Sequence, residues 1–227
     1  MILLLSDCSR TIAQSISRSD KIHSIRTYSR DKDLVNLRRE QIARSAAVVF
    51  VKKGYDKASI REIAKACRMS IGSLYHYIGT KEDILRLVFE YLAFREREFI
   101  DSLSSYETLT PTELLRKAIG IYYQAIHDIQ DIVVLAYQET KSLKRPEREF
   151  TFEKERIIIS VFEELLDRGC KAGEFEINDI TLVANNIVTI GDTWAFRRWL
   201  LQKRYTLEDY ITEQTNIIID GIRSRNR

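Results

Sequence analysis

Helix-breaking residues are scarce throughout this sequence, and that scarcity limits the folds open to it. The 227 residues include only two prolines and eight glycines. Long helices can therefore run without interruption, whereas a turn-rich β fold would need many more of these residues. Apolar residues also recur at helical spacing along most of the chain. We expect an all-α protein of roughly nine helices and no strand.

Capping signals place the ends of the expected helices. Ser59 and Glu62 fit a capping box, in which a hydroxyl and a carboxylate each accept a hydrogen bond from the other residue's backbone N–H. Thr80 begins a second box, and Thr110 precedes a proline at a first helical position. Residues 1–34 show no sustained period and predict a flexible arm, followed by a head (35–81) and a body (82–227). The expected helices cover residues 35–53, 59–66, 70–79, 80–104, 110–128, 130–142, 146–168, 179–201 and 206–222.

The composition is that of a soluble globular protein. Hydrophobic residues make up 44% and charged residues 30%, and no run approaches the roughly eighteen apolar residues of a membrane span. The opening MILLL is too short for a signal peptide, so we expect cytoplasmic residence and no membrane partner. Cys8, Cys67 and Cys170 are odd in number and far apart, and the three histidines are scattered. We therefore expect no disulfide framework, no metal site and no cofactor.

Positive charge is concentrated in the head. Residues 35–81 contain ten basic and three acidic residues, a net charge of +7, which leaves −4 on the rest of a chain of net charge +3. A basic head on a mildly acidic body suggests binding to a polyanion. A solvated basic face without a partner would give the same charge distribution, and charge alone does not separate the two.

Two short helices, joined at residues 67–69, fit a helix-turn-helix. A helix that enters the DNA major groove needs compact, polar side chains at its N-terminal end, because bulky ones hold its backbone away from the base edges. Residues 70–73 meet this demand. Further along, Tyr75, His76 and Lys81 suit hydrogen bonds or charge pairing with phosphates. Each of these residues alone could equally be a core or surface residue.

The segment resembles the DNA-binding head of the tetracycline-repressor (TetR) family across residues 37–88. The matching stretches are IARSAAVVFVKKGYDKASIREIAKACRMS and IGSLYHYIGTKEDIL. The resemblance implies phosphate contacts from Ser59, Tyr75 and Lys81. It implies base-edge contacts from Ser70, Ile71, Gly72, Ser73 and His76.

Two positions depart from the family pattern. Arg68 stands where a turn glycine is usual; a positive φ there would cost arginine about 1 kcal/mol, although its side chain could reach a DNA phosphate. Ile78 replaces a usual phenylalanine, a volume change that a core can absorb.

The same resemblance implies that the body dimerises through its last two helices. Both are strongly apolar, and a helix-turn-helix protein that reads a palindrome needs two copies. These helices could instead pack only on their own core. The residues that we assign to the dimer interface are Ile187, Ile190, Ile211 and Ile218.

The body is also expected to bind a small-molecule effector. Apolar residues mixed with aromatic and cationic ones suit a lipid tail with a phosphorylated head. VVLAYQETKSL and Trp194-x-x-Arg-Arg-Trp199 look similar to TetR-family regulators of fatty-acid metabolism that respond to acyl-CoA. A core stripe beside solvated basic residues is the alternative. The candidate ligand residues are Tyr123, His127, Tyr137, Glu139, Trp194, Arg197, Arg198 and Lys203.

The sequence thus favours a homodimeric repressor, not an enzyme, that binds a palindromic operator in double-stranded DNA and is released by a long-chain acyl-CoA. One alternative is a repressor of efflux or stress genes that senses hydrophobic drugs. Another is an enzyme of acyl-thioester or lipid chemistry, although no nucleophile–base grouping is recognisable. A third is a nucleoid-type DNA binder without operator preference.

Overall fold

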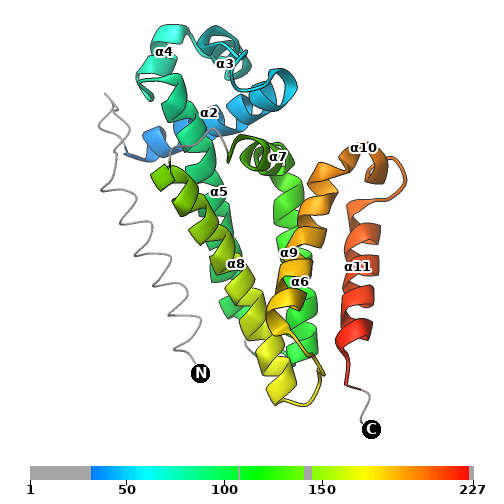
Figure 1. Ribbon diagram of the computed structural model, residues 1–227. Helices are drawn as coiled ribbons and strands as arrows, with labels where there is room; N and C mark the ends of the chain where they lie inside the picture. Colours follow the sequence, from blue (N-terminus) through cyan, green and yellow to red (C-terminus); the bar gives the residue numbers. More distant parts are fainter. Residues whose placement is uncertain (1–31, 107, 141–144, 225–227) are drawn as a thin grey trace. The chain divides into compact units, whose positions relative to one another are not determined.

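The computed structural model describes residues 32–106, 108–140 and 145–224, and its regular structure there is helical throughout (Figure 1). The β contact within these ranges is one isolated antiparallel bridge between Phe175 and Arg223. The prediction of an all-α fold is confirmed. The predicted arm lies outside the described residues up to residue 31.

Most helices begin and end close to the predicted residues. The capping boxes at Ser59 and Thr110 are both formed. The predicted helix 179–201 is instead divided at Arg197, which has φ −109° and ψ 23° and starts a separate short turn. The helices are α2 (Lys32–Lys53), α3 (Ile60–Ala66), α4 (Ile71–Tyr75), α5 (Lys81–Leu103), the 3-10 turn η1 (Ser104–Tyr106), α6 (Pro111–Asp128), α7 (Gln130–Glu139), α8 (Arg145–Lys171), α9 (Ile180–Phe196), α10 (Arg198–Leu201) and α11 (Leu207–Ile222).

The described residues divide into two compact units. The head unit contains residues 32–94, 131–140 and 145–151, and the body unit contains residues 95–106, 108–130 and 152–224. α5 contributes its first part to the head unit and its last part to the body unit. The boundary that the sequence suggested after residue 81 therefore falls inside the head unit.

The head unit is built on a small core that holds α3 and α4 in place. Ile42, Phe50, Ile63, Leu74 and Ile84 come from four different helices, and each is at most 1% exposed. The side-chain amide of Gln41 on α2 donates to the carbonyl of Cys67 in the turn, at 2.8 Å. The helical spacing of apolar residues along α2 would place Leu37 on the buried side, but Leu37 is 61% exposed, whereas Val35 is 5% exposed. The buried side of α2 therefore includes Val35 and not Leu37.

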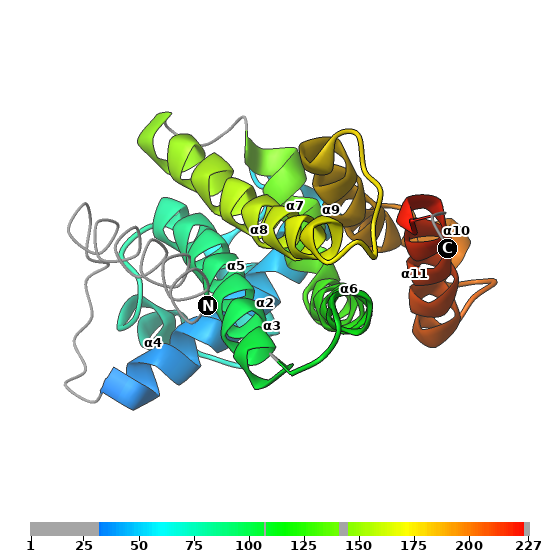
Figure 2. The ribbon, with the colours of Figure 1, turned by 90° about the horizontal axis from the view of Figure 1, so that it is seen from below.

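In the body unit, both α9 and α11 pack against α6. Figure 2 shows the same helices from below, with α6 seen nearly end-on. Gly191 on α9 makes the approach to α6 possible, because a Cβ atom at this position would lie 2.8 Å from the ring of Tyr123 and 3.0 Å from that of Tyr122. α6 therefore presents its two tyrosines directly to the backbone of α9.

Candidate nucleic-acid interface and effector site

The start of α3 is fixed by a complete capping box. The backbone N–H of Glu62 donates to Ser59 Oγ at 3.3 Å, and the backbone N–H of Ser59 donates to Glu62 Oε2 at 3.0 Å. Lys53, at the end of α2, also forms an ion pair with Glu62. The Lys53 ammonium and the Ser59 hydrogen bonds lower the pKa of Glu62 to about 2. Ser59 thus has a structural role in the chain in addition to its predicted phosphate contact.

The turn between α3 and α4 contains Arg68, whose φ is 56°, the one positive value among the described non-glycine residues. The backbone N–H of the next residue, Met69, closes the turn by donating to the Ala64 carbonyl at 2.9 Å. A left-handed arginine costs about 1 kcal/mol relative to glycine. The positive φ that the missing glycine suggested is therefore present, and the Arg68 side chain is exposed.

α4 buries one side and leaves the other open. Ser70 caps the helix by accepting from the Ser73 backbone N–H at 3.0 Å, and Leu74 is fully buried. Ile71 and Tyr75 are 38% and 42% exposed, and His76 is exposed as well. The open surface of α4 therefore combines short or polar groups with the partly exposed side chains of Ile71 and Tyr75.

The packing of the described residues gives no reason for a glycine at position 72. A Cβ atom there would meet only Ser70 Oγ, at 3.9 Å, and the residue has no positive φ. Glycine inside a helix costs about 0.5–1 kcal/mol relative to alanine. No packing contact within the described residues offsets this cost in helix stability. A small residue here would instead allow another molecule to approach the helix backbone closely, as a helix that enters the DNA major groove requires.

Lys81 is held more firmly than a surface anchor would be. Its ammonium donates to the Asp56 carbonyl at 3.1 Å and lies 4.6 Å from the centre of the Tyr55 ring. Burial first, then the nearby Glu82, raises the pKa of Tyr55 to about 12. Lys81 therefore ties the loop before α3 to the first turn of α5, and any phosphate contact would come from this held position.

Aromatic rings form a continuous cluster inside the body unit. It runs from Phe162 on α8 through Phe99 on α5 and Tyr122 on α6, with neighbouring ring centres 5.4–5.8 Å apart. It continues through Tyr123 and Tyr210 to Trp194 and His127, with spacings of 5.0–6.1 Å. We call this set the aromatic cluster. It contains three predicted ligand residues, Tyr123, His127 and Trp194.

Those three residues already have partners within the chain. The Tyr123 hydroxyl donates to the Ile187 carbonyl at 3.1 Å, and Trp194 Nε1 donates to His127 Nδ1 at 2.9 Å. Tyr123 and Trp194 are at most 2% exposed. Their polar atoms thus satisfy one another or the backbone, as buried polar groups require. The burial and hydrogen bonds of Tyr123 and Trp194 fit the core alternative that the sequence left open, and a ligand role for these three residues stays a prediction.

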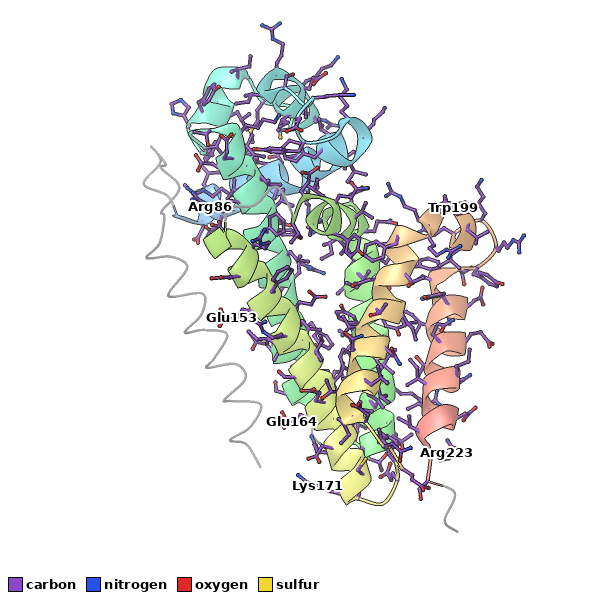
Figure 3. All side chains as sticks on the ribbon, viewed as in Figure 1. Arg86, Glu153, Glu164, Lys171, Trp199 and Arg223 are labelled. Atoms are coloured by element: carbon purple, nitrogen blue, oxygen red, sulfur yellow. The ribbon has the colours of Figure 1, made fainter. Side chains whose placement is uncertain are left out.

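The other predicted ligand residues are not part of this cluster. Tyr137, which is 75% exposed, and Glu139 belong to the head unit. Arg197 and Lys203 are exposed and Arg198 is half-buried, all around α10. Figure 3 labels Trp199 on the same short helix, where it is 63% exposed. Basic and aromatic side chains therefore do gather around α10, but they lie at the surface of the body unit.

Asp192 on α9 is a residue that the sequence analysis missed. The Tyr122 hydroxyl donates to its carboxylate, while burial, with a smaller effect from Glu155, raises the pKa of Asp192 to about 7. The available signal was an acid set within the apolar stretch IVTIGDTWAF. Helical periodicity alone did not indicate whether this acid faces the solvent or the interior.

The body unit also contains a groove of about 400 Å³ along α5 and α6. Its lining includes Arg95, Arg116, Lys117 and Ile121, and none of the predicted ligand residues. Arg95 is paired with Glu98 and Asp128, at 2.8 and 3.4 Å, which offsets most of the charge at that end.

The predicted dimer residues divide into two groups. Ile187 is fully buried and Ile218 is 9% exposed, so the assignment of these two needs correction: their side chains already fill the core of the body unit. Ile190 and Ile211 are half-buried. On the same two helices, Leu182 and Ile217 are 57% and 62% exposed and are the larger apolar surfaces.

Within residues 32–106, 108–140 and 145–224, no group of three or more His, Cys, Asp or Glu residues could hold a metal ion. Likewise, none of the helices described has the length and apolar character needed to cross a bilayer.

Comparison with known proteins identifies relatives along most of the chain. The model for bacterial regulatory proteins of the tetR family matches residues 42–88, and a tetracyclin repressor-like C-terminal domain matches residues 108–202. The HTH-type transcriptional regulator HbdR of Aromatoleum sp. (strain CIB) is 32% identical over 201 residues, which cover 87% of this chain and 86% of that protein.

Two solved structures share the fold. AibR in complex with isovaleryl coenzyme A and operator DNA has a TM-score of 0.65 at 23% identity, covering 79% of this chain and 97% of that one. FadR from Bacillus subtilis in complex with stearoyl-CoA has a TM-score of 0.60 at 21% identity, covering 80% and 95%. At these identities the likeness is one of fold alone.

Proposed function

The chain belongs to the TetR family of bacterial regulatory proteins, which are DNA-binding transcriptional regulators and not enzymes, and from this premise we propose that it is a homodimeric repressor released from a palindromic operator by a fatty acyl-CoA. A repressor of this kind acts on the chromosome, so its proposed location is the cytoplasm. We also propose that residues 35–81 are the DNA-binding domain and that residues 82–227 bind the effector and the second subunit.

The observation that carries the DNA-binding role is the open surface of α4. Gly72 is unexplained by the packing of the chain, and Ser70, Ser73 and His76 lie on the same short helix or at its ends. We propose that this surface enters the major groove. Exposed Arg68 and Tyr75 would then contact flanking phosphates, together with Ser59 and Lys81 from the helix starts.

Dimerisation follows from the proposed operator symmetry. Two heads that read successive major grooves must be held at a fixed spacing, which a two-fold dimer provides. Leu182 on α9 and Ile217 on α11 supply exposed apolar side chains for such an interface. We therefore propose these two as interface residues in place of Ile187 and Ile218.

The acyl-CoA effector is supported by the two acyl-CoA-bound proteins of the same fold and by the make-up of the body unit. The aromatic cluster gives it an apolar interior, and Arg197 and Lys203 give it cationic groups at the surface. Binding would favour a conformation in which the two heads no longer match the operator. This requires the acyl-CoA to bind that conformation more tightly than the DNA-bound one.

A titration tests this proposal. Purified protein is footprinted on its own promoter region, and the protected palindrome is then used in fluorescence anisotropy with isovaleryl-, octanoyl- and palmitoyl-CoA. We expect at least one acyl-CoA to weaken operator binding by tenfold or more at concentrations where CoA and the free fatty acid do not. Release by cationic hydrophobic dyes alone would favour an efflux or stress regulator instead. The absence of any protected palindrome would contradict the repressor itself.

A further inference from the structure

The groove along α5 and α6 extends over most of the length of α6. Its lining on this helix is one face within residues 116–128, which at 1.5 Å per residue spans about 18 Å. At one end, Arg95 of α5 lies 3.4 Å from Asp128. At the other end, the Lys117 ammonium lies 5.0 Å from the centre of the Tyr106 ring. The groove volume of about 400 Å³ is within the range of small-molecule sites.

The end of the groove near the start of α6 carries positive charge that no described acid compensates. Arg116 Nη1 donates to the side-chain oxygen of Asn216 on α11, at 2.7 Å, and Lys117 lies against an aromatic ring. Both partners are neutral. None of the ion pairs formed between described residues includes Arg116 or Lys117. The contacts therefore position two cations while leaving their charge for an anion from outside the chain.

The opposite end of the groove is closed by charges that already satisfy one another. Arg95 forms ion pairs with both Glu98 and Asp128, at 2.8 and 3.4 Å. The side-chain amide of Gln124 also donates to Asp128, at 2.9 Å. An apolar chain that reached these groups would remove water from them without replacing its hydrogen bonds. This end therefore limits the length of any apolar ligand.

The middle of the groove is lined by apolar and small residues. Phe99, Ile121 and Ala125 contribute to this part, together with Gly120. Apart from the backbone of its own helix, the nearest described atom to a Cβ at Gly120 would be Ile211 Cγ2, at an ordinary contact distance of 3.8 Å, and Gly120 has no positive φ. Packing thus does not require glycine here, although glycine weakens a helix relative to alanine. A larger side chain at this position would occupy the groove.

We propose that this groove binds a medium-chain fatty acid in its unesterified form. The lining contains three cations and two acids, a net formal charge of +1 that a monoanion balances. The carboxylate accepts hydrogen bonds from Arg116 and Lys117, and the alkyl chain lies along Phe99, Gly120 and Ile121. This second ligand site goes beyond the proposed acyl-CoA function and does not depend on it.

The free acid suits the groove better than its CoA thioester. In a thioester the chain ends in a neutral carbonyl, which cannot form charge-assisted hydrogen bonds of the same strength with Arg116 and Lys117. The lining from Lys117 to Ala125 spans about 12 Å along α6 before the paired charges begin. Each methylene that is buried there adds affinity, whereas a longer chain gains no further apolar contact.

The test compares ligands that differ in head group or in chain length. Butanoate, decanoate, tetradecanoate, decanol and decanoyl-CoA, each below its aggregation concentration, are titrated by calorimetry into the wild type, Arg116→Gln, Lys117→Gln and Gly120→Leu. Arg197→Gln, at an exposed arginine of the body unit outside the groove, is the matched control. Thermal unfolding verifies that each variant is folded. Lys117→Gln keeps the test valid if loss of the bond to Asn216 unfolds the Arg116 variant.

We expect decanoate to bind the wild type at least tenfold more tightly than either butanoate or decanol, and tetradecanoate to bind no more tightly than decanoate. Arg116→Gln and Lys117→Gln should each weaken decanoate at least threefold and leave decanol unchanged. Gly120→Leu should weaken both ligands about tenfold, because it fills the space of the alkyl chain. Arg197→Gln should behave as the wild type.

Failure of decanoate to bind, equal binding of decanoate and decanol, or the same decanoate affinity in every variant would overturn this inference. Affinity that keeps rising to tetradecanoate would contradict the proposed end of the groove and overturn it as well. If decanoyl-CoA displaces decanoate and is weakened by the same variants, the groove is the acyl-CoA site, which overturns the inference and supports the proposed function. None of the other outcomes affects the proposed release of the operator by acyl-CoA.

Discussion

The surface of α4 and the aromatic cluster of the body unit both contain residues that the sequence predicts to be binding residues, but the fold exposes the first set and buries most of the second. On α4, Gly72, Tyr75 and His76 are left uncovered. In the cluster, Tyr123 and Trp194 are buried, and each has a hydrogen-bond partner inside the chain. Aromatic and polar residues in a helix thus predict a binding surface only when the fold leaves their side chains exposed.

The largest effect should follow from filling the space beside Gly72. Gly72→Gln should leave the protein folded, since apart from the adjacent backbone of its own helix the nearest described atom to a Cβ there is Ser70 Oγ, at 3.9 Å. The longer side chain should nevertheless block close approach of α4 to DNA. We expect operator affinity to fall about 100-fold, or roughly 2.7 kcal/mol, in fluorescence anisotropy. Ala172→Gln, at an exposed residue of the body unit, is the control. Unchanged operator affinity would remove α4 from the interface.

The pH dependence of stability tests the carboxyl of Asp192. The pKa of Asp192 is raised from 3.8 to about 7, so the folded state binds more protons than the unfolded state between these values. Stability is therefore lost as pH rises through this window, and it levels off above pH 7. Relative to Asp192→Asn, the wild type should lose about 2 kcal/mol between pH 4 and pH 8 in urea unfolding, a figure reduced for the partial exposure of the group.

Two further variants check the source of this effect. Glu155→Gln removes the like charge and should make the loss of stability with rising pH smaller. Asp220→Asn, a change at an exposed acid of the same unit, should leave that loss as in the wild type. If the free energies of unfolding of the wild type and of Asp192→Asn change with pH in parallel, the pKa of Asp192 is not raised, and its carboxyl is solvated like that of an exposed acid.

A moderate effect is expected at Tyr123. Tyr123→Phe keeps the ring and removes the hydroxyl that donates to the Ile187 carbonyl, so it should lower the free energy of unfolding by about 1–2 kcal/mol. Operator release by acyl-CoA should be unchanged, because the hydroxyl is engaged within the core. An altered effector affinity with unchanged stability would move Tyr123 from the core to the ligand site.

The smallest change is expected at the turn. Arg68→Gly relieves a φ of 56° and should raise the free energy of unfolding by about 1 kcal/mol. If Arg68 contacts a phosphate, the same variant should bind all DNA sequences more weakly and lower the salt slope of binding by about one unit. A matching Arg61→Gly change, at an exposed arginine of α3, should give no gain in stability.

Local chemistry explains what could be predicted from the sequence. Hydroxyl and carboxylate groups three residues apart act within one turn, so the helix starts at Ser59 and Thr110 could be placed without tertiary information. The positive φ at Arg68 was suggested instead by the resemblance to the TetR family, in which a turn glycine is usual at this position. The end of α9 at Phe196 could not be predicted, because no proline or glycine marks Arg197.

The effector residues were harder because their roles depend on contacts between helices distant in the chain. His127 and Trp194 look like a polar, aromatic binding pair until the hydrogen bond between them is seen. Asp192 looks like an ordinary surface acid until α6 and α8 are placed beside it. Ile187 and Ile218 are apolar enough for an interface, but their own core already uses them.

The left-handed arginine in the turn also has a genetic consequence. Every arginine codon, CGN or AGA/AGG, becomes a glycine codon by a change of its first base, so the more stable turn is always one mutation away. A saturation library at position 68, selected for protein abundance alone, should therefore enrich glycine. The same library selected for repression should enrich arginine if its charge contributes to DNA binding. Comparing the two selections would show how the requirements of folding and of DNA binding differ at residue 68.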